Sequence, residues 1–158
     1  MSNNAIFHEA ISALLREIFD GPPGKETYIL NSGDPGLLNQ LDSINSEVVS
    51  SRRRPGKTTI ASHMKHVSFG MSLLNRSAQG EENPWAGADW DEAWKHTEVS
   101  EKEWTDLRGE LRQQSRDWQA AFKQREDWNE ITASGAVSSV AHTAYHLGAI
   151  RQILAANS

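Results

Sequence analysis

The feature that most constrains the fold is the spacing of apolar side chains, which recur every three or four residues along four long stretches of the chain. This spacing places side chains on one face of an α-helix, whereas strict alternation is the pattern of a strand. No stretch alternates β-branched and polar residues between hairpin turns. The sequence therefore predicts an all-α fold, a four-helix bundle with a long Trp-rich crossover between its second and third helices.

Turn and cap residues bound the predicted helices. The long helices are expected over about residues 5–19, 58–76, 100–128 and 132–155, with a lesser helix over about 34–49. The run Gly21-Pro22-Pro23-Gly24 ends the first helix, because proline cannot continue the hydrogen-bond ladder and glycine tolerates the turn. Thr58 or Thr59 can cap the second helix, and Ser100 with Glu103 predicts a capping box for the third.

Each predicted helix has an apolar stripe that we expect to face the core. The stripes are Ile6, Ala10, Ala13, Leu14 and Ile18; Leu37, Leu41, Ile44 and Val48 in the lesser helix; Ile60, Met64, Val67, Met71 and Leu74; and Trp104, Leu107, Leu111, Trp118 and Phe122. The polar residues opposite the second helix's stripe are Lys65, Ser68, Ser72 and Asn75. The last helix has a further apolar strip, Val140, Leu147 and Leu154, about 140° from its histidines. This strip either packs on the third helix or meets a second copy, and we expect a homodimer.

Composition and charge exclude several classes of function. The chain has 158 residues, 37% of them apolar and 23% charged, which suits one globular domain over residues 1–158. It contains no cysteine, so disulfides, cysteine nucleophiles and thiolate metal sites are excluded. The net charge of -5 disfavours a nucleic-acid partner, and the basic run Arg52 to Arg54 is expected to form a solvated loop. With no apolar run of about 20 residues and no leader peptide, we expect no membrane association and a cytoplasmic location.

Two histidines on the last predicted helix have the spacing of a chelating pair. His142 and His146 are four residues apart, so their rings project from one face about one turn apart. Mostly small side chains share that face and leave space beside the rings for an ion and a bound molecule. These neighbours are Gly135, Ser139, Ala149 and Ile153.

A third ligand could come from the second helix. His63 and His66 both fall in its apolar arc, and periodicity does not choose between them. Two histidines from one helix and one from another give three nitrogen ligands and an open position, the arrangement of catalytic divalent ions.

The alternative to a metal site is a purely structural role, in which these histidines are buried and hydrogen-bond to their neighbours. His-x-x-x-His is common on helices, so the spacing alone does not exclude this role. The His-Glu-x-x-His chemistry of zinc proteases is excluded, since Thr143 stands where the glutamate base would be. We expect the remaining histidines near the middle and start of the chain, His8 and His96, on the surface.

Three segments resemble the DinB-like family of four-helix proteins: TTIASHMKHVSFGMSLLNR, the crossover with Asp89-Trp90 and Trp94, and the closing VAHTAYHLGAIRQIL. The resemblance covers most of the chain and implies an up-down-down-up bundle that frequently dimerises. It also implies one divalent ion, commonly zinc or nickel, held by a histidine of the first segment and two of the last helix. On this sequence the implied ligands are His66, His142 and His146.

Two positions depart from the pattern of many relatives. His63 stands where they carry another, often aromatic, residue, and the resemblance makes it a neighbour of the site rather than a ligand. After the second histidine of the last helix many relatives read Leu-Gly-Gln, whereas this chain has Ala149 in place of the glutamine. The change removes a polar group near the ion and leaves substrate handling open.

The expected function is that of a metal-dependent enzyme, of thiol transferase or hydrolase type, acting on a small molecule. Transfer to or from a low-molecular-weight thiol is preferred, because a thiolate suits a borderline-soft ion held by nitrogen. The side chains of Trp85, Trp90 and Trp94 could line the ligand pocket. Tryptophans at such spacing also anchor long loops to a helical bundle. The alternative is a non-enzymatic module, in which the ion only fastens the helices or the protein binds a small molecule in a stress response.

No general base can be assigned from the sequence. Asp89, Asp91 and Glu92 are candidates because they lie in the crossover that would border the pocket. The same carboxylates could equally belong to a solvated loop, with one of them capping a turn.

Overall fold

The computed structural model describes residues 3–52, 58–126 and 128–157, and its regular structure within these ranges is entirely α-helical. The helices are α1 (Asn3–Asp20), α2 (Leu37–Asp42), α3 (Ser46–Ser50), α4 (Ile60–Ala78), α5 (Trp90–Lys95), α6 (Glu101–Gln124) and α7 (Glu130–Asn157). The prediction of an all-α fold is confirmed. None of the helices in these ranges combines the length and apolar character that a membrane crossing requires. Arg53 and Arg54 of the basic run lie outside the described residues.

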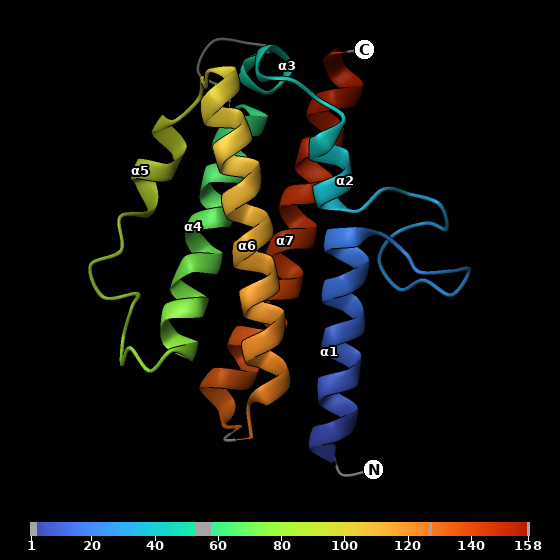
Figure 1. Ribbon diagram of the computed structural model, residues 1–158, viewed down its shortest axis with the longest axis vertical. Coiled ribbons are helices and arrows are strands. Elements are labelled where there is room, and N and C mark those ends of the chain that lie inside the picture. Colours follow the sequence, from blue (N-terminus) through green and yellow to red (C-terminus); the bar gives the residue numbers. More distant parts are fainter. Residues whose placement is uncertain (1–2, 53–57, 127, 158) are drawn as a thin grey trace.

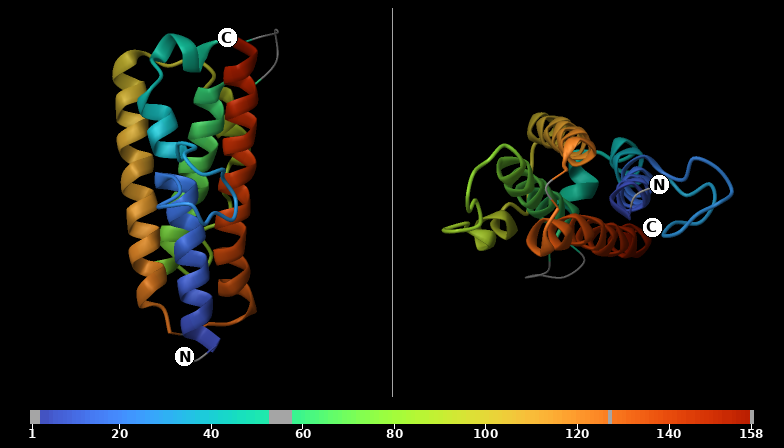
Figure 2. Two further views of the ribbon diagram at one scale, coloured as in Figure 1. Left: turned by 90° about the vertical axis from the view of Figure 1, so that its right-hand side faces the viewer. Right: turned by 90° about the horizontal axis from the view of Figure 1, so that it is seen from below.

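The long helices α1, α4, α6 and α7 lie side by side along the longest axis of the molecule (Figure 1). Helices α1 and α7 run toward the end where the C-terminus lies, whereas α4 and α6 run the opposite way (Figure 1). Helix α4 packs against α6 and α7, and α1 packs against the same two helices from the other side. The end view in Figure 2 shows the space that these four helices enclose.

Large apolar side chains from α4 and α6 fill much of that space. The predicted stripe of α6 is buried over its whole length. The predicted stripe of α4 is also buried, except that Leu74 is half-buried. The indole N–H of Trp104 donates to the carbonyl oxygen of Ile44 over 2.9 Å, so burial of this ring leaves no polar atom unpaired. The predicted capping box at Ser100 fixes where α6 begins. Of the two threonines that could cap α4, Thr59 is the cap, and it forms a capping box with Ser62 that the sequence did not predict.

The buried face of α1 differs from the prediction. Its buried apolar side chains are Ile11, Leu15, Ile18 and Phe19. Ile6 is 55% exposed, and Ala10 also faces solvent. The helix is turned by about one position because burying Leu15 and Phe19 removes more apolar area from water than burying two alanines would.

The lesser helix predicted over residues 34–49 is in fact two short helices, α2 and α3. Asn45 separates them, because its side-chain oxygen accepts a hydrogen bond from the backbone N–H of Val48 over 3.0 Å and starts a new helix. Gly36 precedes α2 where a Cβ would lie 2.2 Å from the backbone nitrogen of Gly21. Only glycine allows the start of α2 to lie this close to the end of α1.

Two helix faces outside the predicted stripes are also buried. The side of α4 opposite its stripe is covered by α6, so Ser68 and Asn75 are buried and hydrogen-bond to Glu110 and Gln114. The second apolar strip of α7 also lies inside the chain: two of its members are buried and the third is half-buried. It therefore packs in the core and gives no support to a dimer.

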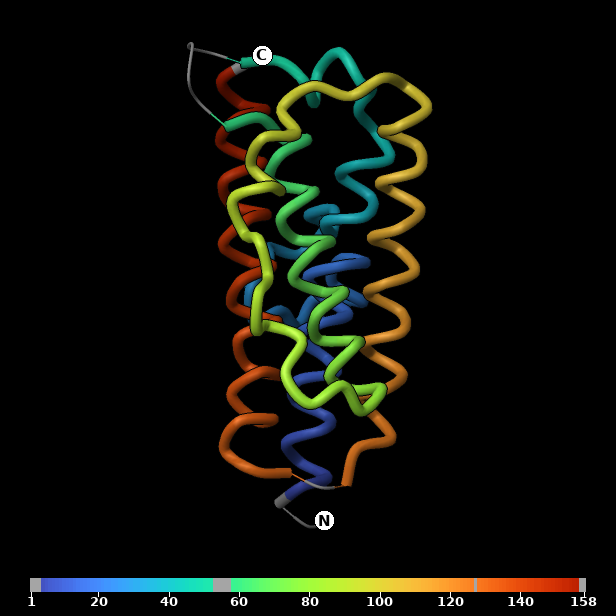
Figure 3. The backbone as a smooth tube through the Cα atoms, turned by 90° about the vertical axis from the view of Figure 1, so that its left-hand side faces the viewer, coloured from blue at the N-terminus to red at the C-terminus, as the bar shows by residue number. Residues whose placement is uncertain are grey.

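The Trp-rich crossover between α4 and α6 contains the short helix α5. Helix α5 packs against α4, and Figure 3 shows the crossover running along the outer side of α4. This placement brings Trp90 and Trp94 of the crossover over the first half of α4, where its two histidines lie.

Candidate metal centre

Four histidines face one another across the contact between α4 and α7. Helix α4 supplies His63 and His66, and α7 supplies His142 and His146. The Thr59 cap lies one turn before His63 and so sets the rotation of both α4 rings. The four-residue spacing on α7 places its two rings on one face, as the sequence predicted.

Three of these rings, which we call the histidine cluster, bring their Nε2 atoms together. The Nε2 atom of His142 lies 3.1 Å from that of His66 and 3.0 Å from that of His146. Ligand atoms of the three rings all lie within 4.8 Å of one another. In the part of the chain that the structure describes, no carboxylate and no further histidine joins this group.

His63 lies next to the histidine cluster but points its nitrogens elsewhere. Its Nδ1 atom lies 2.8 Å from Nδ1 of His146, and its Nε2 atom lies 3.1 Å from the hydroxyl oxygen of Thr58. Periodicity left His63 and His66 as equal candidates for the third ligand. The structure brings His66, and not His63, to the meeting point of the Nε2 atoms.

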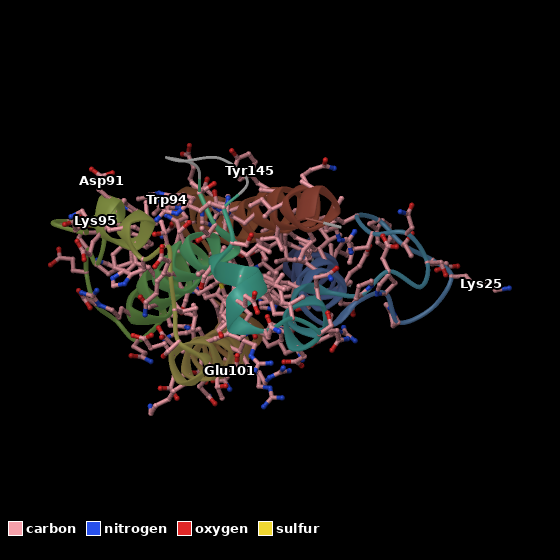
Figure 4. All side chains as sticks on the ribbon, turned by 90° about the horizontal axis from the view of Figure 1, so that it is seen from above. Lys25, Asp91, Trp94, Lys95, Glu101 and Tyr145 are labelled. Atoms are coloured by element: carbon pink, nitrogen blue, oxygen red, sulfur yellow. The ribbon has the colours of Figure 1, made fainter. Side chains whose placement is uncertain are left out.

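Tryptophans of α5 cover the outer side of the histidine cluster. The ring of Trp94 stacks on His66, with centroids 4.5 Å apart and planes 28° from parallel, and meets His63 edge-on at 5.2 Å. The ring centroid of Trp90 lies 5.3 Å from that of His66. In Figure 4, Trp94 projects toward the bundle, whereas Asp91 and Lys95 project from the outer side of α5. The stacking fixes the plane of the His66 ring.

The surroundings lower the pKa of all four histidines. Burial lowers the pKa of His63 and of His142. Burial, followed by the charges of His142 and His63, lowers the pKa of His66 to about 4. Burial, followed by the charges of the other three rings, lowers the pKa of His146 to about 3. The imidazoles are therefore neutral near pH 7, and a neutral ring keeps a lone pair for a metal ion.

A cavity of about 320 Å³ lies between α4, α7 and the crossover and adjoins the histidine cluster at His142. Its lining residues include His142, Trp85, Trp90, Gly70 and Ser139, and none of them is charged. The small residues predicted beside the histidines contribute Gly135 and Ser139 to this wall. A Cβ atom on Gly70 would lie 3.6 Å from the His142 ring, so glycine here keeps the space beside the ring open. A larger cavity, of about 670 Å³, lies between α3 and the start of α6 and contains no residue of the cluster.

Two of the three acidic residues proposed as candidate bases have other roles. Asp89 caps α5, since its Oδ1 atom accepts hydrogen bonds from the backbone N–H groups of Asp91 and Glu92 over 3.1 Å each. Glu92 pairs with Lys95 over 2.7 Å. None of the three carboxylates belongs to the histidine cluster.

The two histidines expected on the surface differ from each other. His96 is exposed, as predicted. His8 is half-buried, and its Nε2 atom accepts a hydrogen bond from the indole N–H of Trp128 over 2.6 Å. The expectation for His8 was wrong because its partner lies 120 residues away and has no signal in the local sequence.

The donor set fits a divalent ion. A neutral imidazole offers at Nε2 either one N–H or one lone pair, so the Nε2 atom of His142 cannot form a proper hydrogen bond to both neighbours at once. A tetrahedral zinc ion, with Zn–N bonds of about 2.0–2.1 Å, separates its nitrogen ligands by about 3.3 Å. The separations of 3.0 and 3.1 Å are slightly shorter, and a small movement of the rings admits an ion. The three histidines could therefore hold a metal ion.

The fold and the site together define a helical protein with a candidate tri-histidine metal centre. A sequence model of the DinB superfamily matches residues 36–150, which include all members of the histidine cluster. The chain belongs to the DinB superfamily, and the resemblance noted in its sequence is confirmed. Neither the comparison with curated proteins nor that with solved structures found a match.

Two contacts of the site had no signal in the sequence. The stacking of Trp94 on His66 depends on how the crossover folds back over α4. The pairing of His63 with His146 joins residues 83 positions apart. Only the packing of α4 against α7 brings these side chains together.

Proposed function

We propose that this protein is a metal-dependent enzyme whose ion, zinc or nickel, is held by His66, His142 and His146. The observation that carries the proposal is the convergence of three Nε2 atoms beside a cavity that has His142 in its wall. Bound by three imidazoles, such an ion lowers the pKa of a water or thiol and polarises a substrate oxygen. The chain's own residues hold the ligand rings neutral, in fixed planes and largely away from bulk water.

The proposed substrate is a small molecule, with a low-molecular-weight thiol as cosubstrate. The cavity beside His142 has no charged side chain, so we propose that an uncharged part of the substrate lies there. Trp85 and Trp90 offer it flat apolar surfaces. Ser138 lines the same cavity and could orient a polar group, whereas the Ser139 hydroxyl is already used by Trp118 and by the Ala136 carbonyl.

The experiment compares turnover by metal-free, zinc-loaded and nickel-loaded protein on a panel of electrophiles, with and without thiols. We expect metal-dependent turnover that His142→Ala abolishes. Trp85→Ala should weaken substrate binding while it leaves metal content unchanged, because Trp85 lines the cavity and lies outside the histidine cluster. If no compound on the panel reacts faster with the loaded protein, the non-enzymatic alternative becomes the better account.

We also propose that α1, α4, α6 and α7 form the up-down-down-up bundle of the family and that the chain forms a homodimer. The support for a dimer comes from exposed apolar side chains on α7, where Ile131 is 78% and Tyr145 is 72% exposed. Light scattering across a tenfold dilution should give about twice the chain mass of 17.6 kDa. A constant mass of 17.6 kDa would show a monomer.

A further inference from the structure

Both ring nitrogens of His63 are in hydrogen-bonding contact, and neither contact is with the converging Nε2 atoms. One links Nδ1 of His63 to Nδ1 of His146 over 2.8 Å, and the other links Nε2 of His63 to the Thr58 hydroxyl over 3.1 Å. The three residues therefore form a chain of hydrogen bonds. It runs from His146, which is 2% exposed, through His63, which is 7% exposed, to Thr58 at the surface.

The need for a lone pair at Nε2 of His146 fixes every proton in this chain. A neutral imidazole carries one proton, so a ring that presents a lone pair at Nε2 must carry its proton at Nδ1. That Nδ1–H group of His146 donates to His63, whose Nδ1 accepts. The proton of His63 then lies on Nε2 and donates to the hydroxyl oxygen of Thr58. One tautomer for each ring satisfies both contacts.

We propose that His63 is a positioning residue that holds His146 in the tautomer and orientation needed to bind the ion. This inference rests on the proposed metal centre. Burial makes the contact matter, because a buried Nδ1–H group that loses its acceptor cannot replace it with water. A hydrogen-bond acceptor behind a ligating histidine fixes the ring and raises its basicity, and loss of such a partner typically weakens metal binding by about 10–100-fold.

His66 shows the contrast within the same cluster. Its Nδ1 atom is buried and has no hydrogen-bond partner among the described residues. Its ring is held by stacking on Trp94 instead. The α7 ligand His146 thus has the polar support, and the α4 ligand His66 has aromatic support.

The test measures zinc affinity by competition with a chromophoric chelator in four variants. His63→Phe keeps the ring volume but removes the acceptor, and we expect its affinity to fall by about 10–100-fold at an unchanged stoichiometry of one ion. His63→Asn should recover most of the loss, because its side-chain oxygen lies close to where Nδ1 was. Thr58→Val should cause a smaller loss in the same direction and alters only a surface residue. His96→Phe is the matched control, an exposed histidine outside the cluster, and should bind zinc like the unaltered protein.

A spectroscopic measurement separates positioning from a general effect on structure. In the zinc-loaded protein, ¹⁵N NMR of the histidine side chains should show a protonated Nδ1 on His146, with its proton at low field. The signal should remain in His63→Asn and move or vanish in His63→Phe.

Two results would overturn the inference while leaving the metal centre intact. In one, His63→Phe binds zinc as tightly as the unaltered protein. In the other, His63→Asn is as weak as His63→Phe and the Nδ1 signal of His146 is the same in both. A failure of the unaltered protein to bind zinc would instead contradict the proposed function and this inference with it.

Discussion

Two clusters among the described residues combine histidine with tryptophan, and they differ in what the histidine nitrogens face. One is the histidine cluster with the tryptophans of α5. The other, which we call the aromatic cluster, joins the start of α1 to the end of α6 and consists of Phe7, His8, Phe122 and Trp128. In the aromatic cluster the Nε2 atom of His8 is occupied by the indole N–H of Trp128. In the histidine cluster three Nε2 atoms face a common point.

The difference shows that burial beside tryptophan does not by itself make a histidine functional. A single ring whose nitrogen accepts a good hydrogen bond is satisfied and stabilises the contact of two helices. Three rings whose nitrogens face one another are not satisfied by the protein alone. The cation that would satisfy them is what distinguishes a site from a structural contact.

The largest expected effect is on metal affinity. His142→Ala or His146→Ala removes one of three ligands and should weaken zinc binding by at least about 100-fold, whereas His8→Ala should leave it unchanged. Metal analysis after dialysis against a weak chelator measures the difference. A full equivalent of ion retained by His142→Ala would remove the distinction between the two clusters.

The next effect concerns the stability of the metal-free protein at acidic pH. The folded chain holds the pKa of His66 at about 4 and that of His146 at about 3, against about 6.5 for an unfolded histidine. Between about pH 6.5 and 4 the unfolded chain binds protons that the folded chain does not, so the free energy of unfolding falls as the pH falls. Above about pH 6.5 these two histidines do not change how the free energy of unfolding depends on pH.

Urea unfolding of the metal-free protein at several pH values between 7.5 and 4.5 measures this slope. The double variant His66→Asn, His146→Asn should show a shallower slope, and His8→Asn provides the comparison at the aromatic cluster. An equal slope for the double variant and the unaltered protein would show that the histidine cluster does not cause the pH dependence.

Removal of the ion should have a moderate effect on stability. An ion present at about 100 times its dissociation constant stabilises the folded chain by about 2.7 kcal/mol, which corresponds to roughly 5–10 °C in Tm for a chain of this size. Because the core of α1, α4 and α6 forms without the histidines, helical circular dichroism at room temperature should survive chelation. Loss of the helical signal on chelation would indicate a structural ion.

The smallest expected effect lies in the aromatic cluster. Trp128→Phe removes the hydrogen bond to His8 and should lower the free energy of unfolding by about 1–2 kcal/mol, with no change in zinc affinity. Trp85→Phe, which removes a partly exposed indole, is the matched control and should lower the free energy of unfolding by less. A change in zinc affinity in Trp128→Phe would mean that the two clusters are coupled.

The sequence predicted what depends on local spacing. The capping box at Ser100, a threonine cap at the start of α4 and the burial of the α6 stripe follow from residues a few positions apart. The same is true of the shared face of His142 and His146. These features hold because helical geometry alone decides them.

What the sequence could not predict depends on contacts between distant segments. Periodicity gave α1 a stripe through Ala10, although Leu15 and Phe19 decide its rotation. It also left Ser68 on a polar face that α6 in fact covers. His63 and His66 fit the same apolar arc, and only the packing of α4 against α7 distinguishes the nitrogen that meets His142 from the one that supports His146.

The most direct test of the metal centre is an anomalous-difference map from crystals of the zinc-loaded protein, collected on both sides of the zinc absorption edge. We expect one peak per chain, about 2.0–2.1 Å from the Nε2 atoms of His66, His142 and His146, with the remaining coordination position free of protein atoms. A map with no peak among these rings, or with the peak bonded to His63 in place of His66, would contradict it.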